Sequence, residues 1–134
     1  MNFDEFIGQV QHRARLSSRE HAERATRAVL ETLALRLSGG EPKNLASQLP
    51  PEIGRYLLEP TAGAGKRFGA REFYDLVALR EGIDMQDAAY HVRAVASVLQ
   101  EAVSAGEWEK MLAQLPDDLD QLMESGSEGA GPRL

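Results

Sequence analysis

The sequence predicts an all-α protein built from two tandem copies of a small helical unit, with about four helices each, one of them long, packed into one compact helical bundle. Ala and Leu are plentiful while aromatic residues make up only 6 % of the chain, a balance that favours helices because Ala and Leu lose little side-chain freedom there. Apolar residues recur at spacings of three and four, the period of an amphipathic helix. Motifs of the first half also return in the second half, which indicates an internal repeat.

The repeat is visible as a series of identities between the two halves at one constant shift in residue number. The first half contains Gly40-Glu41 followed by Gln48-Leu49-Pro50, and the second contains Gly106-Glu107 followed by Gln114-Leu115-Pro116, a shift of 66. Further matches join Ala22, Arg27, Ala28, Val29 and Leu33 to Ala88, Arg93, Ala94, Val95 and Leu99. Upstream, Glu5-Phe6 matches Glu72-Phe73 at a shift of 67. We interpret these matches as a duplication with one residue gained or lost in the loop before residue 22.

Each copy is predicted to begin with an amphipathic helix, over 3–13 and over 70–80. A long helix follows, over 19–38 in the first copy. Ser17 with Glu20 resembles a capping box before it, and Asp84 is the expected cap in the second copy. The long helices carry matching apolar stripes: Ala22, Ala25, Val29, Leu30, Leu33 and Leu37, and Ala88, Val92, Val95, Ala96, Leu99 and Val103. Gly39-Gly40 and Gly106 are predicted to stop these helices.

Two short helices complete each copy, over 41–48 and 51–58 and over 107–114 and 117–124. The first of each pair must end before Pro50 or Pro116, because the residue preceding a proline is pushed out of the helical region. The predicted organisation is therefore repeat 1 over 3–58, a Gly/Pro linker over 59–69, repeat 2 over 70–124, and a tail over 125–134 that is expected to be disordered.

Composition excludes several functional classes. The chain has no cysteine, which rules out disulfides, thiolate metal sites and cysteine nucleophiles. No secretory signal begins the chain, and no apolar run is long enough to span a membrane. We therefore expect a cytoplasmic protein that does not enter the membrane.

No motif predicts an enzyme, a cofactor or a metal. Gly63-Ala-Gly-Lys66 lacks the glycine spacing and the Ser or Thr of a phosphate-binding loop. The histidines, His12, His21 and His91, lack metal-ligand spacing, and we interpret them as surface or cap residues. The acidic residues after Pro116 are explained by a helix N-terminus, where carboxylates are favoured. We thus expect no catalytic residues, no cofactor-binding residues and no metal ligands.

These features together are similar to a known family. An N-terminal helix with Phe6, a long Ala/Val/Leu helix, and then Gly-Glu and Gln-Leu-Pro followed by an acidic residue, all present twice, resemble the bacterial family named domain of unknown function 2267. The resemblance covers about residues 3–123. It implies a compact bacterial α-helical protein and attaches no reaction to it.

The absence of chemical motifs favours a non-enzymatic protein–protein interaction module. The alternative is a small-molecule or metal-ion binding protein with its site between the two repeats, where a duplicated unit creates an interface. A further alternative is an anionic partner such as nucleic acid, bound by the arginine-rich first repeat. The net charge of −6 and the absence of aromatic residues among the arginines argue against nucleic acid.

Charge is unevenly distributed along the chain. Residues 1–67 carry ten Lys or Arg and eight Asp or Glu, whereas residues 68–134 carry five and thirteen, so the halves have net charges of +2 and −8. Opposite charges on the two halves suggest a weak twofold homodimer in which each positive half meets the partner's negative half. The predicted interaction surface is Arg13, Arg15, Arg24, Arg27, Asp117, Asp118 and Asp120.

Overall fold

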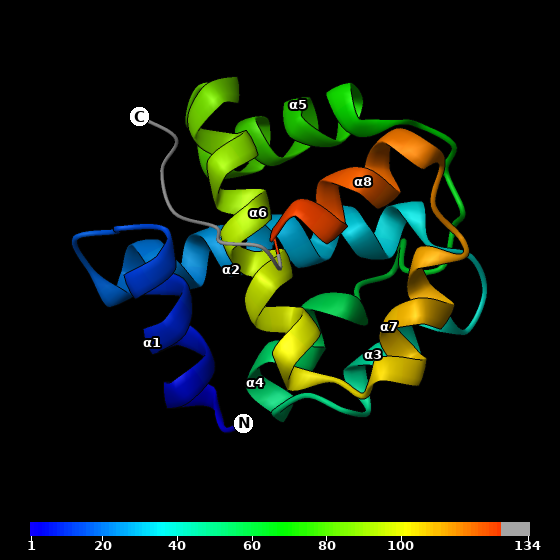
Figure 1. Ribbon diagram of the computed structural model, residues 1–134, viewed down its shortest axis with the longest axis horizontal. Helices are drawn as coiled ribbons and strands as arrows, with labels where there is room; N and C mark the ends of the chain where they lie inside the picture. Colours follow the sequence, from blue (N-terminus) through cyan, green and yellow to red (C-terminus); the bar gives the residue numbers. More distant parts are fainter. Residues whose placement is uncertain (127–134) are drawn as a thin grey trace.

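A computed structural model describes residues 1–126 and confirms an all-α protein (Figure 1). Within that range there are eight α-helices and one 3-10 helix, and the only β-type contact is an isolated bridge between Ser38 and Ala64. The elements are α1 Phe3–Arg13, α2 Arg19–Arg36, α3 Glu41–Ala46, α4 Pro51–Gly54, η1 Arg55–Leu57, α5 Ala70–Glu81, α6 Met85–Ala102, α7 Ala105–Leu112 and α8 Asp117–Gly126. The expected tail began at residue 125, but α8 continues to Gly126, and residues 127–134 lie outside the described range.

Helices follow one another in the same order in both halves. The two long helices, α2 and α6, are each 18 residues long, and their first residues, Arg19 and Met85, are related by the shift of the repeat motifs. The first helices, α1 and α5, begin at Phe3 and Ala70, which are related by the larger shift that the upstream identities predict. Superposition of the two halves, and with it the tandem repeat, stays a prediction.

The two long helices form the centre of the molecule. In Figure 1, α2 runs across the middle and α6 crosses it, while α5 lies along one side and α1 at one end. Both α1 and α5 contact both long helices, so the first helix of each half also packs on the other half.

Small polar residues on the long helices are therefore buried as well. The hydroxyls of Thr26 and Thr32 on α2 each donate to the carbonyl four residues earlier at 2.8 Å, which satisfies them inside the core.

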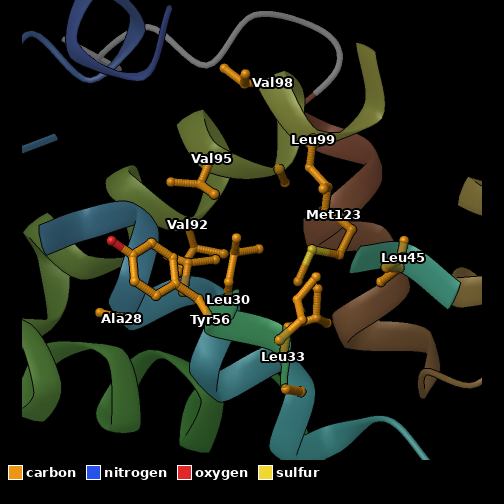
Figure 2. Packing of buried hydrophobic residues seen from close by; sticks show 14 of the residues in the cluster. Ala28, Leu30, Leu33, Leu45, Tyr56, Val92, Val95, Val98, Leu99 and Met123 are labelled. Atoms are coloured by element: carbon orange, nitrogen blue, oxygen red, sulfur yellow. The ribbon is translucent and has the colours of Figure 1, made fainter. Parts of the chain in front are cut away.

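The apolar stripes of α2 and α6 meet in one core. Every residue of the two predicted stripes is buried, which confirms the helical spacing read from the sequence. Figure 2 shows Leu30 and Leu33 of α2, Leu99 of α6 and Met123 of α8 directed into this interior. Leu33 and Leu99 are each 1 % exposed. The core thus joins both halves of the chain, and neither half has one of its own.

One predicted helix cap and one predicted helix stop are wrong. The N-cap of α2 is Ser18 and not Ser17, because the Ser18 hydroxyl accepts from the His21 N–H at 3.1 Å. Gly106 does not stop α6, which ends at Ala102, but lies inside α7. Ser104 caps α7, its side chain accepting from the Glu107 N–H. A serine cap satisfies an exposed amide of the new helix, so α7 begins two residues before the predicted start.

The Gly/Pro linker closes the end of α2, which stops at Arg36 and not at residue 38. The Gly63 N–H donates to the Ala34 carbonyl and the Gly65 N–H to the Leu37 carbonyl, both at 2.9 Å. These bonds occupy carbonyls that a helix end leaves unsatisfied. Gly63 has φ +81° and lies so close to Gly39 that a Cβ would stand 2.3 Å from the Gly39 carbonyl oxygen. Only glycine fits this contact.

Candidate functional site

The repeated Gln-Leu-Pro motif connects the two halves. Gln48 Oε1 accepts from the Ser104 N–H at 2.8 Å, and Gln114 Oε1 accepts from the Ser38 N–H at the same distance. The two glutamines differ by 66 in residue number, and so do the two serines. The second bond therefore joins the residues that the predicted repeat pairs with those of the first bond. A side chain of each half thereby satisfies a backbone amide in the loop that precedes the third helix of the other half.

The repeated Gly-Glu motif places two carboxylates together between α3 and α7. Glu41 is 4 % exposed and Glu107 8 % exposed. Their Oε1 atoms each lie 3.9 Å from Lys110 Nζ, and both Oε2 atoms are buried without a hydrogen-bond partner among the described residues. Burial first, and then the neighbouring Glu107 carboxyl, raises the pKa of Glu41 to about 7. The pair therefore holds a proton that isolated glutamates would release.

A pocket of about 360 Å³ lies where the first two helices of each half meet, and we call it the corner pocket. Its walls come from the end of α1 and its following turn, the start of α2, the end of α5 and its turn, and the start of α6. The lining residues are Ala14, Arg15, Leu16, His21, Arg24, Glu81, Ile83, Asp87, Tyr90 and His91. Since both halves contribute, the pocket has the location expected for a small-molecule site between the repeats.

A buried histidine–glutamate pair forms part of the wall. His91 Nδ1 lies 2.7 Å from Glu81 Oε2, and the two side chains are 9 % and 4 % exposed. Glu81 Oε1 is buried and has no hydrogen-bond partner in the described part of the chain. The other ring nitrogen of His91, Nε2, likewise makes no hydrogen bond within residues 1–126. This atom is not fully buried. Glu81 therefore positions the ring and leaves its second nitrogen for the pocket.

The interpretation of His91 as a surface or cap residue is wrong, because its ring is buried between α5 and α6. The sequence did contain a signal for the pair. At the repeat shifts of 66 and 67, His91 and Glu81 correspond to Ala25 and Ala14, which are both buried. Two small apolar residues of one half are thus replaced together by an ionisable pair in the other half. Such a paired change at buried positions indicates a polar site.

Arg15 enters the pocket from an uncommon backbone conformation. Its φ is +53°, and it is the one non-glycine residue with positive φ among residues 1–126. At the shift of 67 it corresponds to Gly82, which has φ +74° and ends α5. Glycine accepts this left-handed region freely, whereas a residue with a Cβ does so at a cost. The first half therefore keeps an arginine where the second half has the residue that the backbone prefers.

The predicted interaction surface does not form one patch. Arg13 donates to Ser97 Oγ at 3.0 Å and to Glu101 Oε1 at 2.8 Å, joining α1 to α6. Arg27 pairs with Glu31 on its own helix at 2.9 Å. Arg15 and Arg24 both line the corner pocket.

The acidic members of that surface lie in the first turn of α8. Asp118 Oδ2 accepts from the Ala70 N–H at 3.0 Å and so caps α5 from another helix. Asp120 lines a second, wider hollow of about 790 Å³ between α6, α7 and α8, beside Trp108. Among the residues that the structure describes, no buried ion pair of the kind found in the corner pocket lines this hollow. We therefore take the corner pocket as the candidate site.

Two searches over the described residues bear on other functions. Within residues 1–126, no three His, Asp or Glu side chains gather in a way that could hold a metal ion. In the same range, no helix combines the length and the apolar character that crossing a bilayer requires.

Comparison with known proteins places the chain in a family. No curated protein matches it. The profile of the uncharacterized conserved proteins DUF2267, the family that the sequence resembles, matches residues 3–122, which is most of the chain. The protein therefore belongs to the DUF2267 family.

Proposed function

We propose that this protein binds a small molecule in the corner pocket. The observation that carries the proposal is the buried His91–Glu81 pair in the pocket wall, 2.7 Å apart and partly unpartnered. Burying ionisable groups is expensive, and well-packed apolar residues are often at least as stabilising. The corresponding positions of the first half are in fact occupied by alanines. A polar pair kept in a cavity between two halves is the arrangement of a ligand site.

The structure gives weaker support to the first expectation, a protein–protein interaction module, than to a ligand pocket. The large apolar side chains exposed within residues 1–126 are Met1, Leu58 and Leu79, at 47 %, 55 % and 79 %. They belong to the N-terminus, the segment after η1, and α5, whereas protein interfaces centre on clustered apolar or aromatic anchors. The nucleic-acid alternative is also weakened, because Arg13 and Arg27 already form ion pairs with acidic residues of the same chain. Our proposal is a binding function without a reaction, in a bacterial cytoplasmic protein.

Native mass spectrometry of the protein purified from its host tests this proposal. The comparison variant carries Glu81→Ala together with His91→Ala, which gives the second half the alanines of the first. This double variant should fold as stably as wild type, or more stably, since a buried ion pair is replaced whole. Wild type should retain a small molecule that the variant lacks. The proposal fails if wild type carries no small molecule, or if both proteins carry the same one equally. A retained protein chain in place of a small molecule would favour the interaction module.

A further inference from the structure

We infer that the ligand of the corner pocket carries an oxyanion, a carboxylate or a phosphate, held by the guanidinium groups of Arg15 and Arg24 and by His91. This inference rests on the proposed binding function and names the chemistry of its ligand.

The first argument is the state of the two arginines. Both line the pocket and are exposed, and neither forms an ion pair with any residue of the described chain. Other arginines nearby are already bonded to carboxylates: Arg13, Arg19 and Arg27. A guanidinium presents planar N–H donors that match the oxygens of carboxylates and phosphates. Two unpaired guanidiniums at one cavity therefore form a receptor for such a group.

The second argument is the backbone of Arg15. Its left-handed conformation, φ +53°, is one that Gly82 adopts without cost at the corresponding place in the second half. Replacing Arg15 by glycine would relax the turn after α1, so the arginine is not required by the local fold. A side chain that is held at a backbone cost, lines a pocket beside Tyr90 and forms no ion pair within residues 1–126 is explained by what it binds.

The third argument is His91. Its Nδ1 is engaged by Glu81, so Nε2 is the ring atom left to a ligand. When the ring is protonated, Nε2 donates a hydrogen bond that an oxyanion accepts. The titratable groups around it are Glu81 of α5, Tyr90 and Asp87 of α6, and Arg15, Arg24 and His21 from the first half. Because Glu81 and Asp87 are acidic, the pocket suits a small ligand with one anionic group better than a polyanion.

The test is a titration followed by NMR. Side-chain signals of Arg15, Arg24 and His91 are recorded while sodium acetate is added in one series and sodium phosphate in another. Sodium chloride keeps the ionic strength constant, because screening alone would change surface electrostatics. Saturable shifts of these signals with at least one anion are expected, and the anion that acts distinguishes a carboxylate ligand from a phosphate ligand.

Variants separate a pocket from general surface charge. Arg15→Gly and Arg24→Gln should each weaken anion binding by about tenfold or more, the scale of a lost charge-assisted contact. Arg15→Gly should at the same time unfold at a higher urea concentration than wild type, so lost binding cannot be attributed to a damaged fold. Arg27→Gln is the matched control, since it removes the same charge from the exposed surface of α2 outside the pocket. It should bind as wild type does.

Three results would overturn the inference: no saturable shift with either anion, equal weakening by Arg27→Gln and Arg24→Gln, or unchanged binding in Arg15→Gly. The proposed function is tested separately. A retained small molecule without an acidic group would refute the oxyanion and leave the binding function standing. The absence of any retained molecule would refute the binding function itself.

Discussion

Replacing Glu41 by glutamine should change how the stability of this protein depends on pH. Glu41 and Glu107 are buried neighbours, on α3 and α7, and Lys110 Nζ lies 3.9 Å from one oxygen of each. Glutamine has the shape of a protonated glutamate and can donate to the Glu107 carboxylate. The variant therefore mimics the protonated state of Glu41 at every pH.

The magnitude follows from the pKa. In the folded protein burial raises the pKa of Glu41 from 4.5 to about 7, and each pKa unit corresponds to about 1.4 kcal/mol. Because the folded state holds the proton more tightly than the unfolded chain, this stability is fully present below pH 4.5 and is lost as the pH rises through about 7. Wild type should thus lose up to about 3 kcal/mol at this site between those limits, and Glu41→Gln should lose none of it.

Urea unfolding at about pH 5 and about pH 8, followed by Trp108 fluorescence, measures this difference. The chain contains one tryptophan, and Trp108 is 3 % exposed, so its emission reports on the core. Relative to wild type, Glu41→Gln should gain up to about 3 kcal/mol at the higher pH and change little at the lower. Glu109→Gln, an exposed position on α7, should follow wild type at both. Parallel pH dependence of wild type and Glu41→Gln would refute the shared proton.

Other predictions concern the core, the contacts between halves and the oligomeric state. Leu33→Ala and Leu99→Ala should each destabilise by about 2–5 kcal/mol, whereas Leu79→Ala on the surface should stay within about 0.5 kcal/mol; equal urea midpoints for all three would show that the stripes do not pack. Gln48→Ala and Gln114→Ala should each cost about 1 kcal/mol, because each removes the acceptor of one backbone amide; a measurable loss for only one of them would contradict their equivalence. The homodimer is still a prediction, and it should dissociate only modestly as salt is added, since exposed ion pairs contribute about 0–1 kcal/mol each; a strict monomer during sedimentation at high concentration in low salt would refute it.

Local sequence patterns were enough to predict the order of the helices and the buried stripes of the two long ones. Apolar spacing of three and four places one stripe on a helix whatever the rest of the chain does, so the stripes of α2 and α6 could be predicted residue by residue. Pro116 and the capping residue Asp84 act within a few residues of themselves, and for that reason α8 and α6 begin where the sequence predicts. The identities at a fixed shift led to the family, which the matching profile shows.

The candidate site was only partly predictable. Arg15 and Arg24 were expected in an interaction surface from their charge, and both line the corner pocket. The positive φ of Arg15 was not foreseen, because no local motif demands it. His91 and Glu81 could have been found by comparing the halves, since alanines stand at the corresponding positions.

Tertiary structure alone decided which surfaces meet. Periodicity shows that a helix has an apolar face but not which neighbour covers it, and α2 and α6 are enclosed by helices of both halves. The electrostatic interaction of Glu41 with Glu107 and the bond of Gln48 to the Ser104 amide each join residues that are far apart in the sequence. Such pairs are set by how whole helices pack, since the free energy of packing belongs to the assembled core and not to any short segment. The pKa of Glu41 and the corner pocket both follow from that packing, so they exist only in the folded chain.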